Sequence, residues 1–218
     1  MPLEDYKDIV GTCASITTIG QFFSGVFICK DIVKKGSTEN VADTPFIGGI
    51  AVSLLMYVYA KILNDPAMVS VNIAGITLNV GYLLCYYLYT HDKKSVLKHI
   101  WNAFLICAVF VAYAWWEDPD LIEHRFGIIV TVLLLLLIGS PLFSLGEIIR
   151  SKSSASLPFP LILSGTVVSA EWLLYGIIIK NHFIQLQNAV ALVLSAIQLS
   201  LFVIYPSKPK EKEEKKKD

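Results

Sequence analysis

The chain has 218 residues, of which 55% are hydrophobic and 17% are charged, with 18 basic and 18 acidic side chains. The length alone allows one or two globular domains, but the charged residues fall between long apolar stretches, which excludes an ordinary water-soluble protein. The formal net charge of zero is the sum of basic and acidic residues that lie in different parts of the chain. It gives no indication of binding to nucleic acid, and we expect no nucleic-acid partner.

Seven apolar stretches follow one another along the chain, and each approaches the roughly 20 residues needed to cross a bilayer core. We therefore predict an all-α integral membrane protein with seven transmembrane helices. The predicted spans are Ile9–Cys29, Phe46–Leu63, Met68–Tyr89, Ile100–Trp116, Phe126–Gly146, Phe159–Ile179 and Phe183–Tyr205. The fourth is the shortest in purely apolar residues, because it contains Asn102 and ends on tryptophans typical of a membrane interface.

Basic residues are divided unequally between the two sets of connections. Fourteen lie in one set, which includes the carboxyl-terminal tail, and four lie in the other. Cytoplasmic loops hold the excess of Lys and Arg, and an odd number of spans places the termini on opposite faces. We expect the amino terminus outside and the tail, 206–218, disordered in the cytosol.

Cysteine and histidine give no indication of a metal or of catalysis. All four cysteines fall inside predicted spans, and all four histidines lie in loops or at span ends without ligand spacing. We expect no disulfide framework, no metal site and no enzymatic activity.

The first third of the chain recurs in its last third, displaced by 116 residues. Matched positions include Gly25 with Pro141, Ser37 with Ser153, Tyr59 with Tyr175, and Asn72 with Asn188. Two three-span units in the same orientation need one returning span between them. We therefore predict parallel three-helix repeats over 9–90 and 126–205, joined by a linker helix over 100–116, with the functional site at the repeat interface.

Asn72 and Asn188 fall at equivalent positions inside the third span of each repeat. An amide both donates and accepts hydrogen bonds, and polar groups inside a membrane are costly unless they are paired or line a pathway. Their symmetric placement favours lining of a shared cavity. The alternative is a hydrogen bond between neighbouring helices.

A set of motifs resembles the SWEET family of sugar transporters, also called MtN3/saliva, and especially its animal members. The motifs are Lys34–Asn40 followed by Pro45-Phe46, Val71-Asn72 with Gly75, Ser140-Pro141-Leu142, Lys152-Ser153 with Leu157-Pro158-Phe159, and Trp172 with Tyr175-Gly176. The resemblance implies facilitated, bidirectional diffusion of a mono- or disaccharide, glucose or a related sugar, by alternating access and without a cofactor. It also implies residence in the bilayer of the plasma membrane, or alternatively of the Golgi or another endomembrane, with a homo-oligomer as an allowed state.

The resemblance assigns Trp172 and Met56 to the substrate site beside the two asparagines. An indole face packs on the apolar face of a sugar ring, and the ring nitrogen can donate to a hydroxyl. The alternative for Trp172 is an anchor at the membrane interface.

The resemblance also implies hinges and a gate. Gly25, Pro45, Pro141 and Pro158 match the family's four hinge prolines, with glycine in the first place. Glycine also loosens a helix. We expect proline to be tolerated better at position 25 than one turn away, because it restores the residue that the resemblance implies. Pro45 and Pro158 could instead simply start helices. Tyr59 and Asn181 match the outer gate.

Glu171 does not follow from the resemblance. A carboxyl group inside a span is a functional hypothesis, and three roles are open. It could be neutral and donate to sugar, it could couple transport to protons, or it could pair near the outer face, with Lys61 as a partner.

Two further functional classes compete with sugar transport. PQ-loop transporters of amino acids or cystine are usually proton-coupled, but the Pro-Gln dipeptides that name them are absent. A seven-span receptor would share the topology, but it would not repeat at 116 residues.

Overall fold

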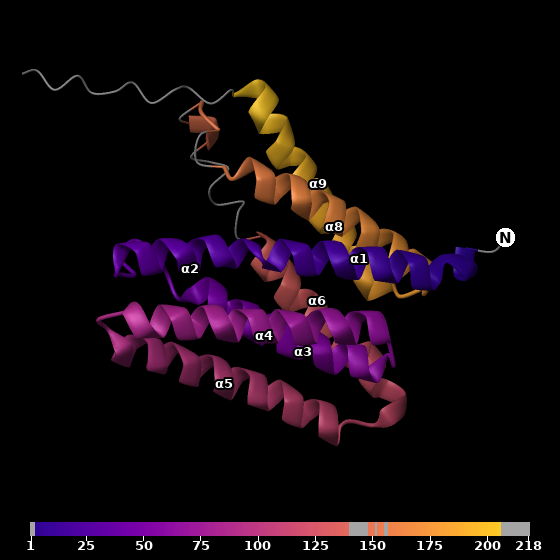
Figure 1. The fold of residues 1–218 in the computed structure, drawn as a ribbon. Helices are drawn as coiled ribbons and strands as arrows, with labels where there is room; N and C mark the ends of the chain where they lie inside the picture. The colour runs from indigo at the N-terminus through magenta and orange to yellow at the C-terminus, as the bar shows by residue number, and fades with distance from the viewer. Residues whose placement is uncertain (1–2, 140–147, 151, 155–156, 206–218) are drawn as a thin grey trace, which may run out of the picture.

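The structure is a computed structural model that describes residues 3–139, 148–150, 152–154 and 157–205. The elements are η1 (Leu3–Tyr6), α1 (Lys7–Phe22), α2 (Ser24–Lys35), α3 (Thr44–Ile62), α4 (Pro66–Tyr89), α5 (Lys93–Trp116), α6 (Pro119–Gly139), α8 (Phe159–Ile178) and α9 (His182–Ile204), as Figure 1 shows. Within the described ranges, seven helical stretches are long and apolar enough to cross a membrane, and η1, α1 and α2 together form the first. The predicted all-α fold with seven spans is confirmed.

Several boundaries differ from the sequence-based prediction. The first span runs from Leu3 to Lys35, and the fourth begins at Lys93 rather than at Ile100. Both extensions carry charged side chains. A prediction from hydropathy stops a span at such residues, whereas the helix itself can continue into the headgroup layer, where long charged side chains reach water. The predicted end of the fifth span falls partly in 140–147, outside the described residues.

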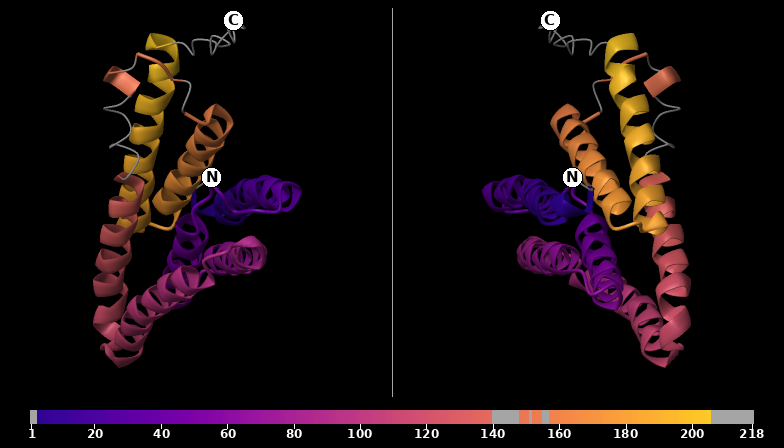
Figure 2. Two further views of the ribbon diagram at one scale, coloured as in Figure 1. Left: turned by 90° about the vertical axis from the view of Figure 1, so that its left-hand side faces the viewer. Right: turned by 90° about the vertical axis from the view of Figure 1, so that its right-hand side faces the viewer.

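The helices form two groups of three. In the first repeat α4 packs against both α1 and α3, and in the second α9 packs against both α6 and α8. The groups meet where α1 packs on α8 and where α3 packs on α6, while the linker α5 lies along α3. The end-on views of Figure 2 separate the orange and yellow helices α8 and α9 from the indigo and magenta helices of the first repeat.

The turns between the second and third helices of the two repeats have the same construction. Asn64 and Lys180, 116 residues apart, both have positive φ, at 52° and 56°. The next residues, Asp65 and Asn181, accept from the backbone N–H three residues on, at 2.9 Å and 3.0 Å, and so cap α4 and α9. A side chain that satisfies a free N–H at a helix start fixes where the helix begins.

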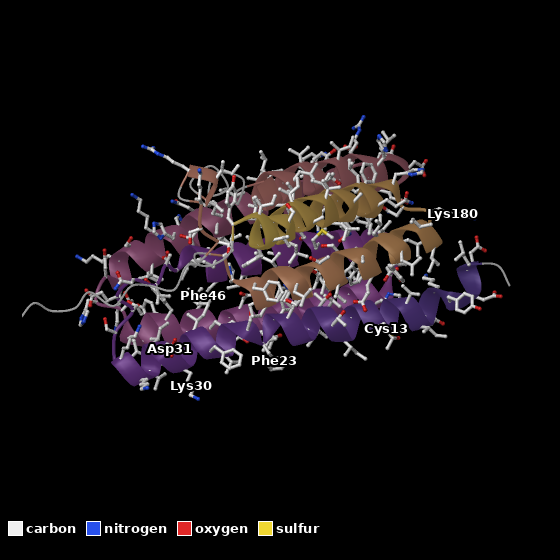
Figure 3. All side chains as sticks on the ribbon, turned by 90° about the horizontal axis from the view of Figure 1, so that it is seen from above. Cys13, Phe23, Lys30, Asp31, Phe46 and Lys180 are labelled. Atoms are coloured by element: carbon white, nitrogen blue, oxygen red, sulfur yellow. The ribbon has the colours of Figure 1, made fainter. Side chains whose placement is uncertain are left out.

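Charged residues mark the two ends of the molecule. Lys30 and Asp31 lie in the second half of α2, Lys180 lies toward the opposite end of the molecule, and apolar side chains such as Phe23 project between them (Figure 3). We call the end that holds η1, the α3–α4 turn and the α8–α9 turn the N-terminal face. On moving away from this face, α8 and α9 diverge from α1 and α2 (Figure 1).

A polar cluster fastens the linker to the second repeat at the N-terminal face. Arg125 Nη1 donates to Glu117 Oε2 at 2.8 Å, and the Tyr113 hydroxyl donates to the same oxygen. These bonds, from Tyr113 first and Arg125 second, lower the pKa of Glu117 to about 2. Because the folded-state pKa is depressed, the contribution to stability is present above the ordinary value of 4.5 and is lost as pH falls toward 2.

The first span is interrupted at Phe23, between α1 and α2. The N–H of Val26 bonds to the carbonyl of Phe23 at 3.0 Å, one residue short of the α-helical partner. The carbonyl of Phe22 instead accepts from the Tyr82 hydroxyl of α4 at 3.0 Å. A side chain inserted into the helical hydrogen-bond ladder is a recognised cause of a helix bend.

Gly25 lies beside this interruption, but for a different reason from the one expected. A Cβ at Gly25 would lie 2.3 Å from Cε2 of Tyr82. The absent side chain therefore makes room for the Tyr82 ring, rather than only loosening the helix. This packing argues against the expectation that proline is tolerated better at position 25 than one turn away, because the ring of proline would overlap that of tyrosine.

This packing predicts opposite effects of alanine at two glycines of the same span. Gly25→Ala should lower the thermal unfolding temperature in detergent, because overpacking costs roughly 1–3 kcal/mol. Gly20→Ala is the control, since a Cβ there meets nothing within 4 Å, and alanine gains up to about 1 kcal/mol in helix propensity. Equal temperatures for the two variants would contradict the proposed role of Tyr82.

Candidate functional site

A cavity of about 280 Å³ lies between the two repeats. Its volume lies just below the range of ligand pockets, which is roughly 300–1,000 Å³. All four residues assigned to the substrate site line it: Met56, Asn72, Trp172 and Asn188. The first two come from one repeat and the last two from the other, so the structure brings the predicted set together.

The two asparagines make the same local contact. Asn72 Nδ2 donates to the carbonyl of Met68 at 2.8 Å, and Asn188 Nδ2 donates to that of Ile184 at 2.9 Å. Each bond stays within its own helix and leaves the amide oxygen and the second N–H for another partner. Among the described residues neither amide bonds to a different helix, so the interhelical alternative has no support in this geometry.

Trp172 is buried and is not an interfacial anchor. Its exposed fraction is 9%, its Nε1 donates to Thr18 Oγ1 of α1 at 2.8 Å, and its ring meets that of Tyr175 edge-on at 5.4 Å. Thr18 accepts the hydrogen bond of the indole N–H in this arrangement, so a sugar hydroxyl would have to displace Thr18 to accept from the ring nitrogen. What remains for a ligand is the apolar face of the ring.

Sequence reasoning missed four polar side chains in the cavity lining: Thr18, Ser53, Asn79 and Gln187. Gln187 is 3% exposed, and its Nε2 donates to Thr131 Oγ1 of α6 at 2.7 Å. Asn79 follows Asn72 by two helical turns and so shares its face. That spacing, and the neighbour relation of Gln187 to Asn188, were signals available in the sequence.

Two crossed hydrogen bonds close the cavity toward the N-terminal face. Asn181 Nδ2 donates to the Tyr59 hydroxyl at 2.9 Å. The Tyr175 hydroxyl donates to Asp65 Oδ2 at 2.6 Å. All four residues are buried, and each bond joins a tyrosine of one repeat to the helix cap of the other. The pair of Tyr175 and Asp65 was not predicted. The repeat identifies it, because Tyr175 is the counterpart of Tyr59 and Asp65 is the counterpart of Asn181.

The predicted hinge positions lie in different settings. Pro45 is in the first turn of α3, and Pro158 is the cap of α8, so both occupy helix starts. This placement favours the alternative that they begin helices. Pro141 lies outside the described residues.

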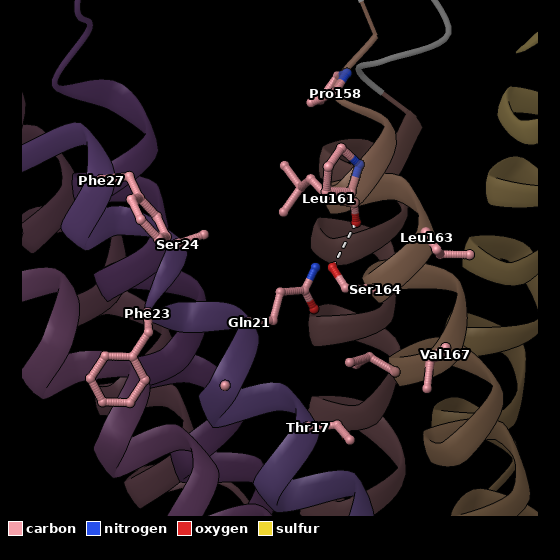
Figure 4. Close-up of a pocket in the computed structure, with 13 residues that line it drawn as sticks. Thr17, Gln21, Phe23, Ser24, Phe27, Pro158, Leu161, Leu163, Ser164 and Val167 are labelled. Carbon is pink, nitrogen blue, oxygen red and sulfur yellow. Dashed lines mark hydrogen bonds between the residues drawn. The ribbon is translucent and has the colours of Figure 1, made fainter. Parts of the chain in front are cut away.

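A larger groove of about 800 Å³ lies between α1–α2 and α8. Figure 4 shows Gln21 and Ser164 extending toward each other across it, with Phe23, Phe27 and Leu161 along its sides. Its lining is largely apolar and shares no residue with the central cavity. The groove follows the divergence of α8 from the first repeat, whereas the polar groups that could orient a ligand gather in the smaller cavity.

Glu171 bonds across the interface of α1 and α8. Its Oε2 accepts from the Thr17 hydroxyl. Glu171 and Thr17 each directly precede a residue of the pair Trp172 and Thr18. The predicted partner Lys61 is not the one found. At the equivalent places of the α3–α6 interface stand Leu55 and Leu133, so one interface is hydrogen-bonded where the other is apolar.

The crossed bonds predict unequal effects of removing the two tyrosine hydroxyls. Tyr175→Phe removes one of the two hydrogen bonds to the buried carboxylate of Asp65, and the loss of a charge-assisted bond costs roughly 1.5–3 kcal/mol. Tyr59→Phe removes a neutral bond worth roughly 0.5–1.5 kcal/mol. Thermal unfolding in detergent should therefore show the larger loss for Tyr175→Phe. A larger loss for Tyr59→Phe would contradict the assignment of the charged pair.

Comparison with known proteins agrees with this geometry. The family model "Sugar efflux transporter for intercellular exchange" matches twice, at residues 8–94 and 124–210. A Sugar transporter SWEET1 of Drosophila pseudoobscura pseudoobscura is 37% identical over 91% of this chain and 89% of its own length. The Bidirectional sugar transporter SWEET2 of Arabidopsis thaliana is 30% identical over 96% and 91%.

A solved eukaryotic SWEET transporter has the same fold. It superimposes with a TM-score of 0.86 at 25% identity and covers 94% of this chain and 99% of its own. The two family matches coincide with the two helix groups, and the family is one of transporters rather than enzymes. The chain is an integral membrane protein that belongs to the SWEET family of sugar efflux transporters.

Proposed function

We propose that the protein is a facilitative, bidirectional sugar transporter that works by alternating access. The observation that carries the proposal is the cavity between the repeats, into which both repeats contribute an asparagine at the same repeat position. A site shared by two repeats can be opened from either side by moving one repeat against the other. The names of the relatives support a sugar as the substrate.

The arrangement around the cavity supports this cycle. The crossed tyrosine bonds hold the N-terminal face closed, while α8 and α9 diverge from α1 and α2 away from that face (Figure 1). Opening the gate requires breaking two bonds between repeats, and closing the other side requires the groove along α8 to narrow. Matches to both halves of the chain leave the receptor and PQ-loop alternatives without support.

The proposal divides the chain into repeats at 9–90 and 126–205, a linker at 100–116 and a cytosolic tail at 206–218, which lies outside the described residues. It places the amino terminus outside and the protein in the plasma membrane. A homo-oligomer is compatible with the proposal.

Flux of labelled glucose, fructose and sucrose in proteoliposomes tests the substrate site. Asn72→Ala and Asn188→Ala should each lower flux by about tenfold or more, since a lost hydrogen bond to the moving sugar costs roughly 1–3 kcal/mol. Asn102→Ala, in the exposed part of α5, is the matched control and should keep full flux. Normal flux in either site variant would remove that asparagine from the site.

Glu171 decides between uniport and proton coupling. We propose uniport, because its repeat counterpart is Leu55, whereas proton relays generally use several titratable groups. Flux should persist without a pH gradient, and Glu171→Gln should keep most of it, since the amide can still accept from Thr17. Accumulation of sugar driven by a pH gradient, and its loss in the glutamine variant, would establish coupling instead.

Cysteine labelling on intact cells tests the orientation. In a variant without the native cysteines, Asp120→Cys should react with an impermeant reagent from outside, because 14 of the 18 basic residues lie in the other set of connections. Ser95→Cys should react only after permeabilisation. The reverse pattern would invert the proposed topology.

A further inference from the structure

A further cavity, of about 380 Å³, lies at the N-terminal face between the first parts of α1 and α4. It is larger than the central cavity and shares no lining residue with it. Lys7, Asp8, Thr12 and Ser15 line it from α1, and Ser70 lines it from α4. A cavity with this many polar groups, away from the proposed sugar path, requires a separate explanation.

The repeat shows that this space is specific to the first half of the chain. In the second repeat, Phe183 stands where the first has Ala67, and its ring covers Gly127, whose Cβ would lie 2.5 Å from Phe183 Cδ2. The same ring meets those of Tyr59 and His124 at 6.4 Å and 5.4 Å. The phenyl ring of Phe183 therefore fills, in the second repeat, the space that the methyl group of Ala67 leaves open in the first.

Polar groups in the cavity remain available to a ligand. Ser15 and Ser70 donate to backbone carbonyls at 2.7 Å and 2.8 Å, so their oxygens can still accept. Lys7, Asp8 and Thr12 make no side-chain hydrogen bond within the described part of the chain. The cavity thus presents a cation and an anion side by side with three hydroxyl groups.

The cavity opens sideways, toward the bilayer. Thr12, Ile16 and Ser70 are exposed, and Ile16 and Ile73, on the same outer faces of α1 and α4, are 66% and 49% exposed. Thr12 and Ser70 lie roughly 6–8 Å from the starts of their helices at 1.5 Å per residue. This depth matches the boundary between the headgroup layer and the hydrocarbon core, the headgroup layer adding roughly 5–8 Å on each side.

We propose that this cavity binds the headgroup of a phospholipid that carries both a phosphate and an ammonium group. Lys7 meets the phosphate and Asp8 meets the ammonium group. The hydroxyls of Thr12 and Ser70 face the glycerol and ester oxygens, and the acyl chains run over Ile16 and Ile73. Charge complementarity and the sideways opening at headgroup depth select a bilayer lipid over a soluble sugar.

A lipid bound here contacts Tyr175, one of the four residues of the crossed hydrogen bonds. Tyr175 forms the floor of the cavity, with its ring against Gly11, where a Cβ would lie 2.8 Å from Tyr175 Cε2. The hydroxyl of the same tyrosine holds Asp65 across the repeat interface. The lipid therefore adds contacts to a residue whose position keeps the N-terminal face closed.

Native mass spectrometry of the purified full-length chain tests the site without a transport assay. Phosphatidylethanolamine is the probe, and phosphatidylglycerol, which has the phosphate but lacks the ammonium group, is the headgroup control. Ala67→Phe introduces the ring that the second repeat already carries, and it should abolish the one-to-one lipid complex. Leu84→Phe, the same ring further along α4 at a position that is exposed and outside the cavity, should retain it.

Asp8→Asn should weaken phosphatidylethanolamine binding by about tenfold, the loss of one charge-assisted contact, and leave phosphatidylglycerol unchanged. This variant and Thr12→Val carry the test if Ala67→Phe does not fold. Undiminished phosphatidylethanolamine retention in Ala67→Phe or Asp8→Asn would overturn the proposal. Retention of glucose or sucrose in place of lipid, lost in Ala67→Phe, would assign the cavity to a sugar and overturn it equally.

Discussion

The two crossed bonds at the N-terminal face, Tyr59 with Asn181 and Tyr175 with Asp65, organise the rest of the structure. Each cap residue also satisfies a backbone N–H of its own helix. The same side chain thus fixes the start of α4 or α9 and ties that helix to the opposite repeat. The third helix of each repeat carries the cavity asparagine, and the contact of its cap residue with the opposite repeat therefore fixes the position of its first turn.

Much of this arrangement could be predicted from the sequence because it rests on periodic or repeated features. Long apolar stretches identify spans whatever their partners are, and a displacement of 116 residues identifies equivalent positions. The displacement pairs Asn72 with Asn188, and the resemblance adds Met56 and Trp172. All four residues line one cavity. The repeat could have supplied the Tyr175–Asp65 pair as well, since it is the image of the predicted Tyr59–Asn181 pair.

The features that could not be predicted depend on partners without a repeat counterpart. Tyr82 interrupts the first span from another helix, and Gln198 stands at its equivalent position in the second repeat. Thr18, 154 residues away in the sequence, accepts a hydrogen bond from the indole N–H of Trp172. Leu134 stands at the position of Thr18 in the second repeat. No local pattern reveals which side chain will fill the space beside a glycine or take a particular proton, because these contacts arise only when the helices pack.

The difference between the two repeat interfaces gives the molecule one stiff side and one compliant side. Hydrogen bonds such as Thr17–Glu171 and Thr18–Trp172 are directional and lose strength over a small displacement, whereas dispersion contacts between leucines tolerate sliding. A relative rotation of the repeats would then pivot about the α1–α8 contact while the α3–α6 contact shears. A protein built from two matching repeats therefore has a built-in mechanical polarity, and the two halves do not perform equivalent motions.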